Sequence, residues 1–276
     1  MLKTHSLISF SILLLLSACN SSPENTSTGT EAPKMNVKEE TVTYSADNLT
    51  MNGFVAYNDA STDKRPVVLI VHEWWGLNDY TKNRARQLAK LGYLAIAVDL
   101  YGNGETADNP EKAQKLAMPF YQNPRMAQLR FDAALTKIKS YAVADPTKIA
   151  AIGYCFGGGV VLNVARLGED LKGVVCFHGS LLGVAPDKNL LKAEVLVCQG
   201  DSDKFVTAEE VSTFQTQMDS IGAHYMIKHY ANATHAFTNP AATETGKKFS
   251  LPIQYNAEAD TASFNDMLSF FGGIFK

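Results

Sequence analysis

The stretch that decides the fold of this chain is IAAIGYCFGGGV, residues 149–160. It predicts a buried apolar strand, then a sharp glycine-rich turn that carries Cys155, and then a helix that begins near Phe156. This pattern is the Gly-x-nucleophile-x-Gly elbow, with cysteine in the place of serine. The close neighbours of such a strained residue can carry no Cβ, which explains the glycines. The N-terminus of the following helix favours negative charge on the sulfur, so we expect a reactive thiol at Cys155.

Two other glycine-rich loops fit this stretch less well. A phosphate-binding loop requires Gly-Lys followed by Ser or Thr after the glycines, and residues 149–160 contain no such sequence. A dinucleotide-binding loop has the pattern G-x-G-x-x-G and belongs to the first βαβ unit, whereas this stretch comes late in the chain. The nucleophile elbow is therefore the favoured interpretation.

The composition is that of an ordinary globular protein. The chain has 276 residues, of which 46% are hydrophobic and 19% charged, and its formal net charge is −3. This balance gives no sign of nucleic-acid binding. No histidine pair has a metal-ligand spacing such as His-x-x-x-His, so no metal is expected, and no cofactor is predicted either. The oligomeric state is left open.

The N-terminus resembles the signal peptide of a bacterial lipoprotein. A basic start is followed by the apolar residues 7–16, which are too few for an ordinary membrane span, and by Leu-Ser-Ala-Cys at residues 16–19. The resemblance implies cleavage before Cys19 and attachment of lipid to its sulfur and its new amine, which together anchor a protein stably. The alternative is a plain secretion signal in which Cys19 is incidental.

The predicted organisation is a signal peptide over residues 1–18, a lipid-anchored flexible linker over 19–40 and one folded domain over 41–276. The linker is rich in Ser, Thr, Pro, Glu and Asn and has almost nothing to bury. Asn20 stands where an aspartate would direct retention in the inner membrane. We therefore expect an envelope lipoprotein of the outer membrane, facing the periplasm or the cell surface.

Apolar strands alternate with amphipathic helices along the folded region, which opens on an antiparallel hairpin of residues 41–44 and 49–57. Continuous apolar strands of this kind predict an α/β fold, a mostly parallel sheet with helices on both faces. Asn256 is expected to cap the last helix, and Arg84, Arg86 and Lys90 to face solvent. The later strands are expected at residues 66–71, 93–98, 149–154, 173–177, 195–198 and 225–230, and the helices at 79–91, 110–121, 126–141, 156–167, 207–221 and 256–271.

Residues suited to nucleophilic catalysis follow the ends of these strands, where parallel sheets bind their ligands. A cysteine nucleophile needs a base, and the base needs an acid that orients it. His235 follows the last strand, and both Asp201 and Asp203 follow the strand at 195–198. Asp203 is preferred because it comes three residues after a glycine and shortly before a valine, as in α/β-hydrolases, while Asp201 is the alternative. The chain order nucleophile, acid, histidine is the one that this fold requires.

The remaining histidines and cysteines of the folded region are expected to have no chemical role. Two cysteines lie in apolar strands and are predicted to be inert core thiols, a disulfide between them being the alternative. The histidines are expected to be polar strand-end or surface residues. The cysteines are Cys176 and Cys198, and the histidines are His72, His178, His224 and His229.

Four motifs together resemble the dienelactone hydrolase family. They are VHEWWGL at residues 71–77, GYCFGG at 153–158, GDSDKFV at 200–206 and HAF at 235–237. They come in the order and at the spacing of that family, and they span nearly the whole folded region. The resemblance implies an α/β-hydrolase fold and a carboxylic ester or lactone hydrolase with a Cys155–His235–Asp203 triad.

The resemblance also implies roles for three residues near the nucleophile. Glu73 would pair with the resting thiol and take its proton when substrate binds. The backbone N–H groups of Trp74 and Phe156 would form the oxyanion hole. For Phe156 the elbow pattern gives the same answer independently, because the residue after the nucleophile supplies one donor. The alternative for Glu73 is a strand-end carboxylate paired with a surface base.

One departure from the family pattern bears on the substrate. The dienelactone enzymes hold the substrate carboxylate with two arginines, but the second of these positions is Asn239 here and residues 100–124 contain no arginine. Lys112 or Lys115 would replace the first only as a point charge. We therefore expect a small neutral ester or lactone as substrate. The alternative function is a lipid-anchored binding protein that kept this fold and lost turnover.

Overall fold

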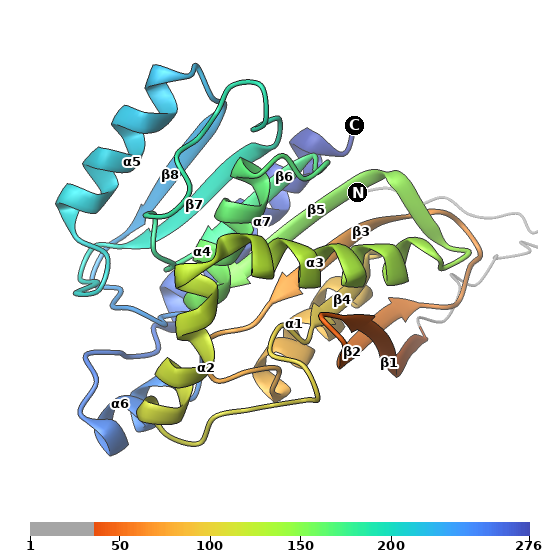
Figure 1. Cartoon of the computed structure of the whole chain (residues 1–276), viewed down its shortest axis with the longest axis horizontal. Coiled ribbons are helices and arrows are strands. Elements are labelled where there is room, and N and C mark those ends of the chain that lie inside the picture. The colour runs from red at the N-terminus through yellow and green to blue at the C-terminus, as the bar shows by residue number, and fades with distance from the viewer. Residues whose placement is uncertain (1–35) are drawn as a thin grey trace, which may run out of the picture. The chain divides into compact units, whose positions relative to one another are not determined.

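Eight strands form one sheet in the order β1-β2-β4-β3-β5-β6-β7-β8 in the computed structural model of this protein, which describes residues 36–276 (Figure 1). The first two strands form the predicted hairpin; β2 also pairs antiparallel with β4, and all later neighbours are parallel. The prediction of a mostly parallel α/β sheet is thus confirmed. The strands are β1 (Val37–Ala46), β2 (Leu49–Asn58), β3 (Arg65–Val71), β4 (Leu94–Val98), β5 (Ala144–Tyr154), β6 (Gly173–Phe177), β7 (Glu194–Gly200) and β8 (Tyr225–Tyr230).

Helices cover both faces of the sheet. One face packs against α1 (Asp79–Lys90) and α7 (Ala257–Ile274), and the other against α3 (Pro124–Lys139), α4 (Phe156–Arg166) and α5 (Ala208–Ser220). In Figure 1, α2 (Pro110–Gln122) and α6 (Ala242–Phe249) lie beyond the carboxyl ends of the strands. The side chain of Asn256 accepts a hydrogen bond from the Ala259 N–H, which confirms it as the cap of α7.

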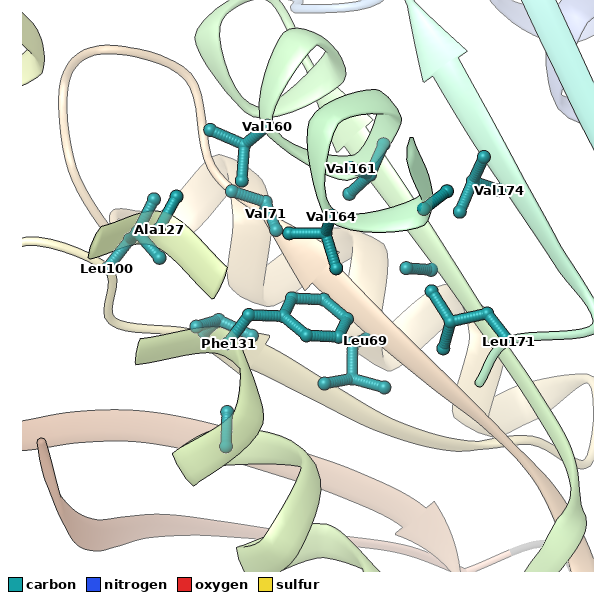
Figure 2. Close-up of a cluster of buried hydrophobic side chains, with 14 of the residues drawn as sticks. Leu69, Val71, Leu100, Ala127, Phe131, Val160, Val161, Val164, Leu171 and Val174 are labelled. Atoms are coloured by element: carbon teal, nitrogen blue, oxygen red, sulfur yellow. The ribbon is translucent and has the colours of Figure 1, made fainter. Parts of the chain in front are cut away.

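The strand residues alternate between two apolar clusters, one on each face. Leu69 and Val71 of β3 point toward α3 and α4, where Phe131 and Val164 meet them (Figure 2). The intervening residues, including Ile70, belong to the cluster under α1 and α7. Burial of each such side chain stabilises the fold by about 1.5–3 kcal/mol. The central strands are therefore held by apolar packing on both faces of the sheet.

The structure corrects the expectation for Arg84. This residue does not face solvent but is 5% exposed, against the side chain of Tyr154. Its guanidinium pairs with Asp260 of α7 and donates to the Thr238 carbonyl oxygen at 2.7 Å. The helical spacing placed it on the polar side of α1, but the partner for its charge comes from the far end of the chain.

The start of the domain also differs from the expectation. β1 begins at Val37, before the residue 41 at which the folded region was predicted to begin. Residues 38–40 are charged, which is typical of a linker. They belong instead to the edge strand of the sheet, where Glu39 pairs with Arg86 at 2.9 Å.

The predicted signal peptide, the lipid site at Cys19 and most of the predicted linker lie outside the residues that the structure describes. Within residues 36–276, no helix has both the length and the apolar character needed to cross a bilayer.

Candidate active site

The nucleophile elbow connects β5 to α4, as the sequence predicts. Cys155 has φ 53° and ψ −115°, a strained conformation for any residue other than glycine. A Cβ on Gly153 would lie 1.9 Å from the Gly157 carbonyl oxygen, and one on Gly157 would lie 2.3 Å from the carbonyl oxygen of Val71. Only glycines at these positions therefore allow α4 to pack closely against β3 and β5. This close packing places Cys155 at the carboxyl ends of the strands.

His235 and Asp203 meet beside this elbow. Nδ1 of His235 lies 2.9 Å from Oδ2 of Asp203, whose side chain is fully buried. The other carboxylate oxygen accepts the N–H groups of Phe205 and Val206 at 2.8 and 3.2 Å. Because its own loop holds one oxygen, the second is aimed at the histidine.

Asp201, the alternative acid, points elsewhere. Its Oδ1 lies 2.8 Å from Nδ1 of His229, and both side chains are about half exposed. The structure therefore brings Asp203, rather than Asp201, to His235.

The surroundings of His235 favour its charged form. Burial acts to lower the pKa of this histidine, but the negative charge of the Cys155 sulfur and the Asp203 carboxylate raise it to about 10. An imidazolium beside a sulfur that can ionise is the arrangement that activates a cysteine nucleophile.

Glu73 lies at the end of β3 and is 2% exposed. Burial raises its pKa to about 7, although a hydrogen bond from Asn239 and the charges of His235 and Arg84 oppose this shift. Nδ2 of Asn239 donates to Oε2 of Glu73 at 2.6 Å, and within the described residues no hydrogen bond joins the carboxyl to the Cys155 sulfur. A carboxyl with a pKa near neutrality can take or give a proton without a large free-energy cost.

Two backbone donors at the site are unused. Within residues 36–276, the N–H groups of Trp74 and Phe156 make no hydrogen bond, although both residues line the cavity that contains Cys155. Free N–H groups at a helix N-terminus and an adjacent loop are suited to an oxyanion that forms during a reaction.

His72 is a buried histidine whose role the sequence does not predict. It fixes the peptide group that carries the Trp74 N–H. The Leu100 N–H donates to Nε2 of His72, so the ring proton is on Nδ1, which donates to the Glu73 carbonyl oxygen at 2.6 Å. That carbonyl belongs to the same peptide unit as the Trp74 N–H. Its neighbour, the Trp74 carbonyl oxygen, accepts from the Tyr101 hydroxyl at 2.9 Å, which fixes the loop on both sides.

His178 is a second histidine whose role the sequence pattern does not predict. Like His72 it follows the last residue of a central strand, and like His72 it is completely buried. Its Nδ1 accepts the backbone N–H of Cys155 at 3.1 Å. A polar residue at the carboxyl end of a buried parallel strand was the available signal for both, because ligand sites form at that edge.

The cavity at the nucleophile has a volume of about 170 Å³. Most of its lining is apolar or aromatic, and within the described residues it includes no lysine or arginine. Lys112, offered by the sequence as a substitute cation, pairs instead with Glu105 at 3.1 Å. The residues that line it are Glu73, Trp74, Trp75, Tyr121, Cys155, Phe156, Ser180, Phe205, Val206, His235, Ala236, Leu251 and Ile253.

The other two cysteines of the described part are buried free thiols, Cys176 and Cys198, and no disulfide joins them. Burial raises the pKa of Cys176 to about 12, which keeps this thiol protonated and unreactive. No group of three or more His, Cys, Asp or Glu side chains in residues 36–276 is arranged to hold a metal ion.

Comparisons with known proteins agree with the fold of this chain. Residues 51–275 match the model of the Dienelactone hydrolase family. Protein usf of Aquifex pyrophilus is 31% identical over 180 residues, which cover 63% of this chain and 77% of that protein. A dienelactone hydrolase-like promiscuous phosphotriesterase from metagenomic libraries is 30% identical with a TM-score of 0.81, over 86% of this chain and 98% of that one. The structure titled m3DLH is likewise 30% identical, with a TM-score of 0.82 over 87% and 99%.

Proposed function

Because this chain belongs to the dienelactone hydrolase family, a family of hydrolases, we propose that it cleaves small neutral esters or lactones with Cys155 as nucleophile. One observation carries the proposal. The Cys155 elbow, the His235–Asp203 pair and the two unused N–H groups converge on one apolar cavity. These are the parts that acyl transfer through a covalent intermediate requires.

The first half of the reaction forms a thioester. The Cys155 thiolate attacks the carbonyl carbon of the substrate, and the carbonyl oxygen becomes an oxyanion that the N–H groups of Trp74 and Phe156 stabilise. The C–O bond to the leaving group then breaks, and the imidazolium of His235 gives its proton to the departing alkoxide. Asp203 keeps the imidazole in the orientation that this transfer needs.

The second half hydrolyses the thioester. Neutral His235 takes a proton from a water molecule, whose oxygen attacks the thioester carbon at the same oxyanion site. Collapse of this intermediate releases the carboxylic acid and returns the Cys155 thiolate beside the imidazolium. No cofactor is needed at any step.

Glu73 is proposed as a further proton acceptor for the thiol. Its pKa of about 7 leaves part of the carboxyl ionised near neutral pH, so that it can accept a proton in the buried site. The hydrogen bond from Asn239 holds its carboxyl at the wall of the cavity that Cys155 also lines.

The neutral substrate class rests on the lining of the cavity. A substrate carboxylate would lose its hydration there without gaining the charge-assisted hydrogen bonds, worth roughly 1.5–3 kcal/mol each, that an arginine supplies. The structural relative described as a promiscuous phosphotriesterase supports a further neutral class, phosphate triesters, as a secondary substrate of this site.

The experiment measures turnover of p-nitrophenyl acetate, a neutral lactone and paraoxon by the purified protein and by Cys155→Ala. We expect hydrolysis of the ester that is lost in Cys155→Ala and retained in Cys176→Ala, whose thiol is buried and does not line the cavity. Ester binding without turnover by the wild-type protein would favour the alternative, a non-catalytic binding protein on the same fold.

We also propose that the protein is an envelope lipoprotein, anchored through Cys19 and held in the outer membrane. The support is the sequence alone, because Cys19 lies outside the described residues. Such an anchor would keep the esterase beside the membrane while a polar segment separates the folded domain from the lipid.

A further inference from the structure

A buried chain of hydrogen bonds connects the backbone of Cys155 to the loop that carries His235. The Cys155 N–H is shared between the Phe177 carbonyl oxygen at 3.0 Å and Nδ1 of His178 at 3.1 Å. Nε2 of His178 lies 2.7 Å from Oγ1 of Thr238, which follows His235 by three residues. His178 and Thr238 are both completely buried.

The direction of this chain follows from its first donor. A backbone N–H can only donate, so Nδ1 of His178 is an acceptor without a proton. The proton of the neutral ring is therefore on Nε2, which donates to the Thr238 hydroxyl. Burial lowers the pKa of His178 well below its ordinary value, and the charge of neighbouring His235 lowers it further, so the ring is neutral.

Thr238 is itself held by α1. Its hydroxyl lies 2.7 Å from the hydroxyl of Tyr80, and its carbonyl oxygen accepts from Arg84 at 2.7 Å. Tyr80 and Arg84 project from a helix that packs on the sheet. The Thr238 end of this chain of hydrogen bonds is therefore attached to a rigid element.

The segments that this chain joins carry unusual backbone conformations. Cys155, His178 and Ala236 have positive φ angles of 53°, 40° and 58°, and none of them is glycine. Such residues cost of order 1–3 kcal/mol each and persist only where the surrounding structure determines them. The hydrogen-bonded chain supplies that determination, because it ties the elbow at Cys155, the loop at His178 and the loop that contains Ala236 to one another.

We propose that His178 and Thr238 are positioning residues that fix the sulfur of Cys155 relative to the imidazole of His235. The inference rests on the proposed function, in which the sulfur attacks the substrate carbonyl and His235 protonates the leaving group. The imidazole rings of His178 and His235 are also in contact, with centroids 5.3 Å apart in an edge-to-face arrangement. A displacement of about 1 Å between reacting groups costs on the order of 10²-fold in rate, so loss of this chain acts on turnover more than on substrate binding.

The test removes the central hydroxyl. Thr238→Val keeps the volume of the side chain and leaves the His178 Nε2–H without an acceptor. With p-nitrophenyl acetate we expect kcat to fall about 10–100-fold while KM changes less than about 3-fold, and Thr238→Ser to restore most of the loss. The matched control is Thr81→Val, because Thr81 is also completely buried and its hydroxyl has no hydrogen-bond partner in the described residues. This control should keep wild-type kcat.

A second variant tests the same hydrogen bonds in case Thr238→Val fails to fold. His178→Asn tolerates the positive φ and keeps an acceptor near the Cys155 N–H, but it is too short to reach Thr238. We expect it to lower kcat as Thr238→Val does, and the double variant to lose little more than either single variant. Full additivity of the two losses, or wild-type kcat in folded Thr238→Val, would overturn the proposal.

A readout independent of turnover separates this inference from the proposed function. The rate at which iodoacetamide alkylates Cys155 reports the thiolate that His235 stabilises. We expect this rate to fall in Thr238→Val and His178→Asn and to be unchanged in Thr81→Val. If no ester were hydrolysed by the wild-type protein, the proposed function would fail while this comparison would still decide the positioning role. Equal alkylation rates in all four proteins would exclude that role.

Discussion

The amide of Asn239 donates a buried hydrogen bond of 2.6 Å to the carboxyl of Glu73, which lines the cavity at Cys155. Burial raises the pKa of Glu73 to about 7, and this hydrogen bond counteracts part of the shift because it stabilises the ionised form. Asn239 stands where the dienelactone enzymes carry an arginine. In this chain the position therefore holds the carboxyl with a neutral donor and adds no charge to the cavity.

Asn239→Asp should move the acidic limb of the pH–rate profile upward. Aspartate keeps the oxygen that accepts the Ala241 N–H at 2.9 Å, but it replaces the donor to Glu73 with a like charge. A like charge raises the pKa of Glu73 further, so its carboxylate forms only at higher pH. We expect the limb of kcat/KM to shift upward by about 1–2 pH units. The control is the same substitution in Glu73→Gln, where no such shift should occur; a shift there would assign the limb to another group.

Glu73→Gln should stabilise the fold at alkaline pH. Glu73 has a pKa of about 7 in the folded protein and an ordinary value of 4.5, so the folded state binds its proton more tightly. The carboxyl costs nothing below pH 4.5, becomes increasingly destabilising as pH rises, and reaches a constant cost of about 3 kcal/mol above pH 7. Urea unfolding at pH 4.5 and pH 8 measures this. The gain in the free energy of unfolding should appear at pH 8 only, together with a reduced but measurable turnover, and an equal gain at both values would refute the assignment.

The sequence predicts those parts of the molecule that depend on local pattern. The elbow at Cys155, the strands and the order of Asp203 and His235 follow from residues that are neighbours in the chain. The burial of Arg84 does not follow from local pattern, because the partner of its charge is Asp260, a residue of the last helix. The same reason hides His178, whose partner Thr238 lies in the loop after β8. A polar residue at a strand end looks the same in sequence whether solvent or another loop faces it.

The short helix α6 is a second example of what local pattern leaves out. The sequence pattern predicts no helix between β8 and α7, and Ala242–Phe249 has no side-chain cap at its start. What stabilises it is tertiary contact, since Phe249 stacks on the indole of Trp75 with ring centroids 6.0 Å apart. The residues that follow it, Leu251 and Ile253, line the active-site cavity.

Asp203→Asn should separate the two candidate acids. Asparagine cannot stabilise the charged imidazole of His235, and it presents either an oxygen or an NH₂ group where a carboxylate stood, so we expect kcat to fall by a factor on the order of 10²–10⁴. Asp201→Asn is the matched control, two residues away and facing His229, and should change kcat less than about 3-fold. The reverse pattern in ester hydrolysis would reassign the acid.

Cys19→Ser should release the protein from the membrane. If Cys19 carries the lipid, serine leaves a precursor that is soluble or uncleaved and partitions into the aqueous phase of a detergent extraction, whereas the wild-type protein enters the detergent phase. Ester hydrolysis per folded molecule should be unchanged, because the folded domain lies beyond the linker. A variant that still fractionates with membranes after a high-salt wash would disprove lipid attachment at this residue.

The lining of the cavity contains no lysine or arginine within the residues that the structure describes, and this predicts which substrates the enzyme favours. The wild-type protein should hydrolyse p-nitrophenyl acetate with a higher kcat/KM than dienelactone, which bears a carboxylate. Tyr121 of α2 lines the cavity and is 51% exposed, so an arginine at this position has room to extend into the cavity mouth.

Tyr121→Arg should therefore raise the ratio of kcat/KM for dienelactone to kcat/KM for p-nitrophenyl acetate by about 10–100-fold. The reason is that one guanidinium–carboxylate contact contributes roughly 1.5–3 kcal/mol that the wild-type cavity does not provide. Tyr121→Gln is the matched control, because it removes the same ring without adding charge, and it should leave the ratio near that of the wild type. A wild-type enzyme that strongly prefers dienelactone, or a ratio raised equally by glutamine and arginine, would show that charge in this cavity does not set the specificity.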